Sequence, residues 1–101
     1  MVLVALILAA AAPADAVPKA RQAYAGCLAD HTQDAKDRKM ARSDFAAGLK
    51  TKCAKKEAEF RTVLIAQDKV DGMSDAEAQE DANDQIAGYI SDMTEEFDSQ
   101  E

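Results

Sequence analysis

The chain is poor in the residues from which metal and redox sites are built. Its 101 residues include a single histidine, His31, and two cysteines, Cys27 and Cys53. A closed zinc site needs four ligands, and a thiol redox catalyst of the common kind needs a C-x-x-C spacing. Neither pattern occurs, and no serine or cysteine is matched with a base and an orienting group. The sequence therefore predicts no metal site, no cofactor and no enzyme.

Aromatic residues are also scarce, at 5% of the chain, and none lies among the clustered lysines. The formal net charge is −7. Nucleic-acid binding needs a basic surface, commonly with aromatic side chains on which bases stack, so a nucleic-acid partner is not expected. Alternation of apolar and polar residues is absent and β-branched residues are few, which excludes an extensive sheet and favours an all-α fold.

No apolar run is long enough to cross a membrane. The longest, residues 2–12, has eleven residues, whereas a spanning helix needs about 20. This length suits the core of a secretory signal, and Ala14-Asp15-Ala16 supplies the small-x-small cleavage pattern. We expect a signal peptide over residues 1–16, cleaved between Ala16 and Val17, and a periplasmic or secreted mature chain with no membrane span. No basic residue precedes the run, which departs from the usual signal pattern. A buried N-terminal helix and an uncleaved anchor are the alternatives, and Pro13 and Asp15, which break the run early, disfavour them.

Export has a consequence for the two cysteines. Removing residues 1–16 leaves 85 residues, a size at which a domain buries only about 60–65% of its unfolded surface. An exported chain meets an oxidising compartment, where an even number of cysteines pairs. The sequence therefore predicts a structural disulfide between Cys27 and Cys53.

Apolar residues recur with helical periodicity in three segments, residues 18–36, 44–71 and 75–97. Gly72 suits a helix end, and Ser74 followed by Glu77 suits a capping box at the next helix start. If the first two helices form an antiparallel hairpin, the cysteine pair centres its turn near Met40. We expect a three-helix, up-down-up antiparallel bundle with the disulfide between helices one and two. The alternative is an elongated chain whose third helix docks weakly or on a second copy.

Two further segments could be taken for sites. Residues 68–72 resemble part of a calcium loop, but with Gly72 at the sixth position the first, third and twelfth positions are Gln67, Lys69 and Ala78, none of which supplies the expected carboxylate. A helix-ending turn is the better interpretation. His31 stands between Asp30 and Asp34 in the apolar stripe of its helix, where it is expected to be half-buried and hydrogen-bonded rather than functional.

Charge is strongly segregated along the chain. Residues 36–61 contain nine basic and four acidic residues, whereas residues 68–101 contain twelve acidic residues and one lysine. The basic segment supplies a candidate partner-binding patch: Lys36, Arg38, Lys39, Arg42, Lys50, Lys52, Lys55 and Lys56. Such a two-signed surface either makes internal attractions between helices two and three, or recruits another protein or an anionic component of the cell envelope.

The elements Ala23-Tyr24-x-x-Cys27, Cys53 and Glu57-x-x-Phe60-Arg61 resemble those of small exported helical proteins of Gram-negative bacteria with one cysteine pair. That resemblance implies a compartment and a fold but no activity. A looser similarity, in size, compartment and cysteine number, is to periplasmic acid-stress chaperones.

From these observations we expect a non-enzymatic exported helical module that acts by binding another macromolecule. Two alternatives remain. One is an acid-responsive, holdase-like chaperone, since many carboxylates lose their charge as the pH falls through about 4. The other is an inhibitor of a periplasmic or extracellular enzyme, with the hairpin tip inserted into its target.

Overall fold

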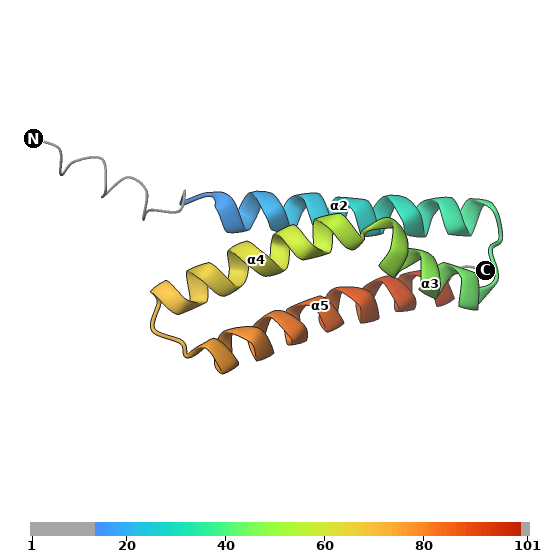
Figure 1. Cartoon of the computed structure of the whole chain (residues 1–101). Coiled ribbons are helices and arrows are strands. Elements are labelled where there is room, and N and C mark those ends of the chain that lie inside the picture. The colour runs from blue at the N-terminus through green and yellow to red at the C-terminus, as the bar shows by residue number, and fades with distance from the viewer. Residues whose placement is uncertain (1–13, 100–101) are drawn as a thin grey trace, which may run out of the picture.

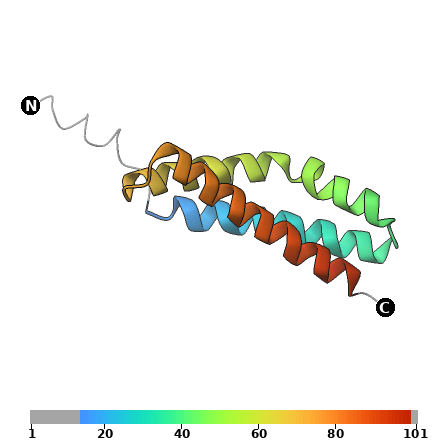
Figure 2. The same cartoon turned by 90° about the horizontal axis from the view of Figure 1, so that it is seen from below.

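The computed structural model describes residues 14–99, and this part of the chain contains helices and no strand. The helices are α2 (Ala16–Asp37), α3 (Arg42–Lys52), α4 (Ala54–Val70) and α5 (Asp75–Asp98). In Figure 1, α3 and α4 return beside α2, and α5 then runs back along the bundle. Figure 2 shows α5 lying obliquely across α2 and α4, with which it packs. The predicted all-α fold is confirmed.

The prediction of three helices is wrong, because the segment predicted as one helix over residues 44–71 forms two. The break is at Cys53, whose φ of −105° and ψ of 14° leave the helical region. The local charges suit two helix ends at this point: Lys50 and Lys52 lie in the last turn of α3, and Glu57 lies in the first turn of α4. The bend lets Cys53 bond to α2 while α3 and α4 both keep an apolar face toward the core.

Aromatic contacts show how the helices are aligned. Phe45 of α3 stacks on Phe97 near the end of α5, with ring centroids 4.2 Å apart. Tyr24 of α2 stacks on Phe60 of α4 at 5.8 Å, and Tyr89 of α5 meets the edge of this pair. Aromatic pairs at such distances add to the free energy gained by burial alone. A continuous aromatic and aliphatic core therefore joins all four helices.

The two turns are closed by backbone hydrogen bonds. After α2, Lys39 adopts a positive φ of 53° and the Met40 N–H donates to the Ala35 carbonyl. After α4, Gly72 has a φ of 106° and the Met73 N–H donates to the Asp68 carbonyl. Both are left-handed C-terminal caps of the Schellman type. They place the first turn where the sequence predicts it, near Met40, and confirm the helix end at Gly72.

Helix α5 begins with the predicted capping box. The Glu77 N–H donates to the Ser74 hydroxyl oxygen at 3.1 Å, and the Ser74 N–H donates to the Glu77 carboxylate at 2.9 Å. The bond from the Ser74 backbone N–H, and after it the Ser74 hydroxyl, lower the pKa of the Glu77 carboxyl below its ordinary value. The box confirms the predicted start of the last helix at Asp75.

Candidate functional site

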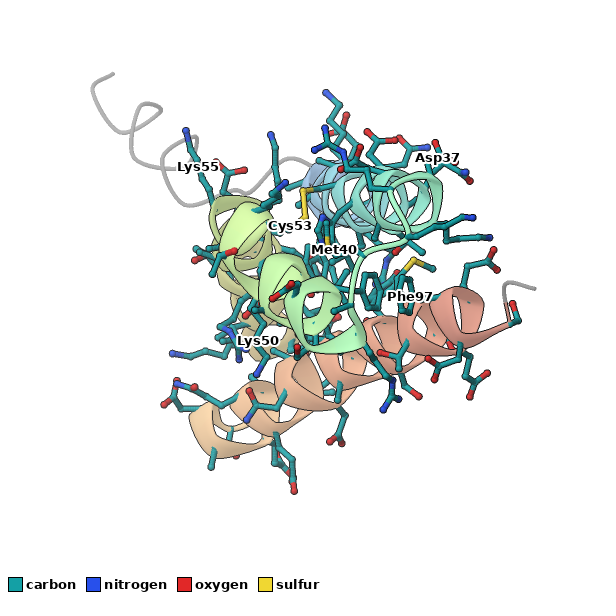
Figure 3. All side chains as sticks on the ribbon, turned by 90° about the vertical axis from the view of Figure 1, so that its right-hand side faces the viewer. Asp37, Met40, Lys50, Cys53, Lys55 and Phe97 are labelled. Atoms are coloured by element: carbon teal, nitrogen blue, oxygen red, sulfur yellow. A yellow bond between two sulfur atoms is a disulfide. The ribbon has the colours of Figure 1, made fainter. Side chains whose placement is uncertain are left out.

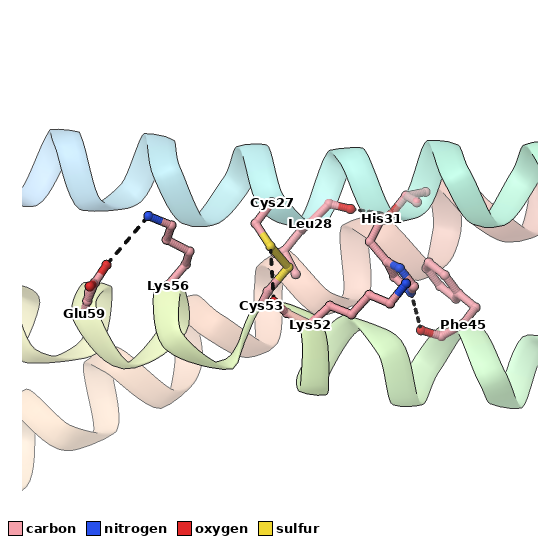
Figure 4. Close-up of a disulfide and its surroundings, with 9 residues drawn as sticks. Cys27, Leu28, His31, Phe45, Lys52, Cys53, Lys56 and Glu59 are labelled. Atoms are coloured by element: carbon pink, nitrogen blue, oxygen red, sulfur yellow. Dashed lines mark hydrogen bonds and ion pairs between the residues drawn. A yellow bond between two sulfur atoms is a disulfide. The ribbon is translucent and has the colours of Figure 1, made fainter.

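The predicted disulfide between Cys27 and Cys53 is present and joins α2 to the break between α3 and α4. The two Cα atoms are 5.9 Å apart. Cys53 is fully buried, whereas Cys27 is partly exposed. Figure 4 shows the bond spanning the space between the two helical layers. The bridge therefore clamps the first helix to the middle of the returning segment.

Three members of the predicted basic patch are neutralised within the bundle. Lys36 lies 2.8 Å from Glu96 of α5. Arg42 makes two hydrogen bonds, of 3.1 and 3.0 Å, to the carboxylate of Asp98. Arg38 forms an ion pair with Asp34 one turn earlier in α2, at 2.9 Å. The end of the acidic α5 therefore pairs with the basic tip of the hairpin.

The other members are exposed lysines. Four of them surround the break at Cys53, and we refer to them as the α3–α4 lysines: Lys50, Lys52, Lys55 and Lys56. Within residues 14–99 only Lys56 among these four has a carboxylate within ion-pair distance, Glu59 at 4.0 Å. Figure 3, which views the hairpin tip, shows Lys50 and Lys55 projecting from different sides of this segment. Lys39, in the α2–α3 turn, is also exposed.

The disulfide lies in an open groove of about 560 Å³ between α2 and the α3–α4 segment. We call it the disulfide groove; its lining consists of Gln22, Ala23, Gly26, Cys27, Asp30, His31, Asp34, Lys52 and Lys56. Carboxylates and the imidazole come from α2, and the ammonium groups come from α3 and α4. The sequence predicts Lys52 and Lys56 as candidate binding residues, but it does not place them opposite His31.

His31 is more tightly held than its sequence context indicates. The side chain is 5% exposed, and its ring stacks on Phe45 with an interplanar angle of 3°. Nε2 lies 3.1 Å from the Phe45 carbonyl oxygen, whereas Nδ1 is buried without a hydrogen-bond partner. A Cβ atom at Gly48 would overlap the imidazole. The absence of a side chain at Gly48 is what admits the ring, and the apolar pattern alone does not signal this contact.

A second groove, of about 720 Å³, runs between α4 and α5. Ile86, Ile90 and Ala58 supply apolar surface, and Lys50 also lines the groove. Arg61 crosses it, donating a hydrogen bond to Asn83 and lying 3.6 Å from the Glu57 carboxylate. Arg61, Asn83 and Glu57 are therefore paired with one another in this groove.

Tyr24 and Asp68 are the two buried groups whose protonation is shifted most. Burial, and after it the Glu57 carboxylate, raises the pKa of Tyr24 to about 12, so the phenol stays neutral in the physiological range. A hydrogen bond to Asp81, and after it burial, raises the pKa of Asp68 to about 6. Asp68 is 8% exposed and one of its oxygens has no partner. The ionised form of this carboxyl is therefore disfavoured at the α4–α5 turn, and in this sense we call Asp68 strained.

The remaining predictions concern membranes, metals and export. No helix within residues 14–99 combines the length and apolar character needed to cross a bilayer. The same part of the chain contains no cluster of three side chains able to hold a metal ion. Most of the predicted signal peptide, residues 1–13, lies outside the described residues. The predicted cleavage bond, between Ala16 and Val17, lies in the first turn of α2, and Val17 packs against the core.

Comparison of the chain with protein-family models, with curated proteins and with solved structures finds no match. Its function must therefore be argued from its own residues.

Proposed function

We propose that the mature chain is an exported, non-enzymatic helical module that binds an anionic partner through the α3–α4 lysines. The observation that carries this proposal is that some of the basic residues have ion-pair partners within the bundle and others do not. The tip cations Lys36 and Arg42 are neutralised by α5, whereas Lys50, Lys52 and Lys55 have no ion-pair partner within residues 14–99. Positive charge is thus concentrated at the break of an otherwise acidic chain.

The mature chain has a net charge of −6, from zero over residues 17–35, +5 over residues 36–61 and −11 over residues 68–101. A protein of this charge is repelled by an anionic surface unless its positive charges are segregated. We therefore expect the mature chain to be retained on a sulfonate matrix at pH 7.5 and low salt. Flow-through of the wild-type chain would contradict the proposal.

Two variants of equal net charge localise the effect. Replacing all four α3–α4 lysines by glutamine is expected to abolish retention. The matched control removes four cations that are already paired, in the variant Lys36→Gln/Arg38→Gln/Arg42→Gln/Lys69→Gln, and is expected to keep most of it. Circular dichroism of both variants must first show the wild-type helix content. Equal loss in the two variants would mean that binding does not depend on the α3–α4 lysines in particular.

A physiological partner is sought by photo-crosslinking in the exporting cell. A crosslinking residue at position 55 is expected to give one reproducible adduct, whereas a crosslinking residue at the exposed position 79 on α5 is expected to give none.

The export step is tested by the intact mass of the secreted or periplasmic protein. A mass that begins at Val17 and lacks two hydrogens supports cleavage and the disulfide together.

One observation favours a second candidate, the acid-responsive holdase. The carboxylates that pair with Lys36 and Arg42 lie at the end of α5, beside the aromatic stack of Phe45 and Phe97. Protonation of these carboxylates removes both pairs, which frees the end of α5 and exposes apolar rings. Aggregation assays at pH 3 with a denatured client test this candidate. A chain that stays fully folded at pH 3, or that opens without protecting the client, rules it out.

A further inference from the structure

The groove between α4 and α5, which we call the α4–α5 groove, is larger than the hollows between α2 and its neighbours. Its volume is about 720 Å³, compared with 560 Å³ for the disulfide groove and 230 and 190 Å³ for two hollows between α2 and α5. Figure 1 shows α4 and α5 running antiparallel beside each other. The lining comes from these two helices and the last turn of α3, and no residue of α2 contributes to it.

The floor of the α4–α5 groove is aliphatic. Ile86 is buried and Ile90 is half-buried, and both line the groove. An apolar strip between two helices is the surface that the apolar face of a third helix covers in helix-in-groove recognition. The described residues contain no strand, so they offer no sheet edge to which an extended peptide could add. The shape of the site therefore favours a helical ligand.

The walls of the groove are low, which lets another helix come close to the floor. Ala54 and Ala58 of α4 and Ala87 and Ser91 of α5 line it, and all four are exposed. Residues four apart lie above one another on a helix, so each pair forms a ridge of small side chains along the helix axis. A helix laid between two such ridges can bury its own apolar side chains on the floor.

The free charge within the groove is positive. Glu57 and Arg61 lie 3.6 Å apart and neutralise each other. Lys50, which lines the groove from the end of α3, has no ion-pair partner within residues 14–99. Lys55 also has none, and it lines an adjoining hollow of α4 that shares Ala58 with the groove. Carboxylates on the α4 side of a ligand are complementary to these two ammonium groups.

The α5 side of the groove has the opposite charge. Glu80 and Asp84 are exposed and have no ion-pair partner among the described residues. They precede Ala87 by about two turns and one turn of α5, so they lie on the side of the helix that carries this wall. Carboxylates of a ligand are repelled from them. A helix in the groove is therefore selected for acidic residues on one edge only.

We propose that the α4–α5 groove binds an amphipathic helix of a partner protein, with its apolar face on the isoleucine floor and its acidic edge toward Lys50 and Lys55. This inference rests on the proposed function and identifies the site and the form of the anionic partner. Residues 54–62 and 83–91 each span about 12 Å of helix. The partner therefore contributes about two turns, with apolar side chains at positions i, i+3 or i+4, and i+7.

The test uses the mature, disulfide-bonded chain and a blocked, fluorescent peptide of about 18 residues, because shorter helices are marginal in water. The peptide carries leucines in one helical face, glutamates on one edge of that face and glutamines on the other. A second peptide has the same composition in an order that forms no apolar face. By fluorescence anisotropy at about 0.15 M salt, the first peptide should bind at least about tenfold more tightly. Equal binding of the two peptides overturns the inference.

Substitutions in the walls test the position of the site. Ala58→Gln/Ala87→Gln fills the groove at unchanged net charge and is expected to weaken binding at least about tenfold, as overpacking predicts. The matched control, Ala66→Gln/Ala76→Gln, changes one exposed alanine of each helix outside the lining and should alter the affinity by less than about twofold. Circular dichroism must first show the wild-type helix content for both. Equal weakening shows that the peptide binds elsewhere and overturns the inference.

Lysine variants test the acidic edge. Lys50→Gln/Lys55→Gln is expected to weaken binding of the glutamate peptide by about two- to tenfold and to leave unchanged the binding of a peptide with glutamine on both edges. Lys19→Gln/Lys69→Gln removes two lysines that are already paired and should change either affinity by less than about twofold. If the first variant binds the glutamate peptide as the wild type does, the assignment of an acidic edge is wrong.

The remaining outcomes separate this inference from the proposed function. If the chain is retained on the sulfonate matrix but binds no amphipathic peptide, the groove assignment alone is overturned. If the chain binds the peptide but is not retained, the proposed function is overturned instead. Sedimentation without peptide is expected to show a monomer. Self-association that Ala58→Gln/Ala87→Gln abolishes would make a second copy of the chain the occupant and overturn the assignment of a partner helix.

Discussion

The two ends of the bundle carry opposite electrostatic arrangements. At the hairpin tip, α5 carboxylates meet Lys36 and Arg42 over the stacked rings of Phe45 and Phe97. At the α4–α5 turn, the buried carboxyl of Asp68 faces a second carboxyl, Asp81. Opposite charges attract each other at the hairpin tip, whereas two carboxyl groups repel each other at the α4–α5 turn. Acidification therefore acts in opposite directions at the two ends of one small domain.

The largest expected effect comes from removing the disulfide between Cys27 and Cys53. The variant Cys27→Ser/Cys53→Ser opens a loop closed by residues 26 apart, which is expected to lower the free energy of unfolding by about 3–4 kcal/mol. Urea denaturation of the two forms measures it. Hydrogen exchange should show that α3 and the tip lose more protection than the turn at Gly72. An equal loss of protection along the whole chain would show that the two ends of the bundle unfold together.

Neutralising the strained carboxyl is expected to have the next largest effect. The pKa of Asp68 is raised from 3.8 to about 6. The folded state therefore binds this proton more tightly than the unfolded state. The stabilisation is present below about pH 4 and is lost as the pH rises to about 6. The variant Asp68→Asn should accordingly stabilise the domain at pH 7 by up to about 3 kcal/mol and have little effect at pH 4.

Thermal unfolding from pH 4 to 7 tests this prediction. The wild-type chain should lose stability across that interval relative to Asp68→Asn, whose profile should be flatter. Asp71→Asn is the control, because Asp71 is exposed and contributes least to the raised pKa of Asp68. Parallel pH profiles for wild type and Asp68→Asn would show that this carboxyl does not strain the turn.

A methyl group at Gly48 tests the packing beneath the tip. The variant Gly48→Ala would place its Cβ against the His31 ring and force that ring away from Phe45. Overpacking of this kind costs about 1–3 kcal/mol. Denaturant unfolding gives the value, and Gly88→Ala on α5, where a Cβ meets no neighbour, is the control. The double variant Gly48→Ala/His31→Ala should recover part of the loss if the clash is its cause.

The ion pairs at the tip should give the smallest change. Both are partly exposed, so Arg42→Gln is expected to cost less than about 1 kcal/mol at low salt. The cost should shrink further at 1 M salt, where screening acts within about 3 Å. A loss that persists at high salt would mean that Arg42 contributes mainly through packing. Chemical denaturation at two ionic strengths distinguishes these results.

Much of the fold could be predicted because its signals are local. The capping box of Ser74 and Glu77 and the turn at Gly72 depend on residues within a few positions of one another. The break at Cys53 could not be read from apolar periodicity, which continues through both α3 and α4. Its local signal was the lysines that end α3 and the Glu57 that begins α4, and these charges carry little free energy.

The candidate site was less predictable than the fold. The sequence groups eight basic residues by their positions along the chain, but the structure pairs Lys36 and Arg42 with α5 and leaves the α3–α4 lysines exposed. Which lysines remain available depends on where the acidic helix ends in space. The hydrogen-bond partner of His31 is likewise a backbone carbonyl from another helix. Every residue has such a carbonyl, so the sequence does not indicate this contact.

The sequence by itself determined the helical class, the position of both turns and the pairing of Cys27 with Cys53. These features follow from periodicity, capping chemistry and the presence of only two thiols. The tertiary structure alone decided the bend at Cys53, the neutralised tip, the unpaired Nδ1 of His31 and the facing carboxyls of Asp68 and Asp81. Each of these depends on the distance between groups on different helices, which is set by packing and leaves no local pattern in the chain.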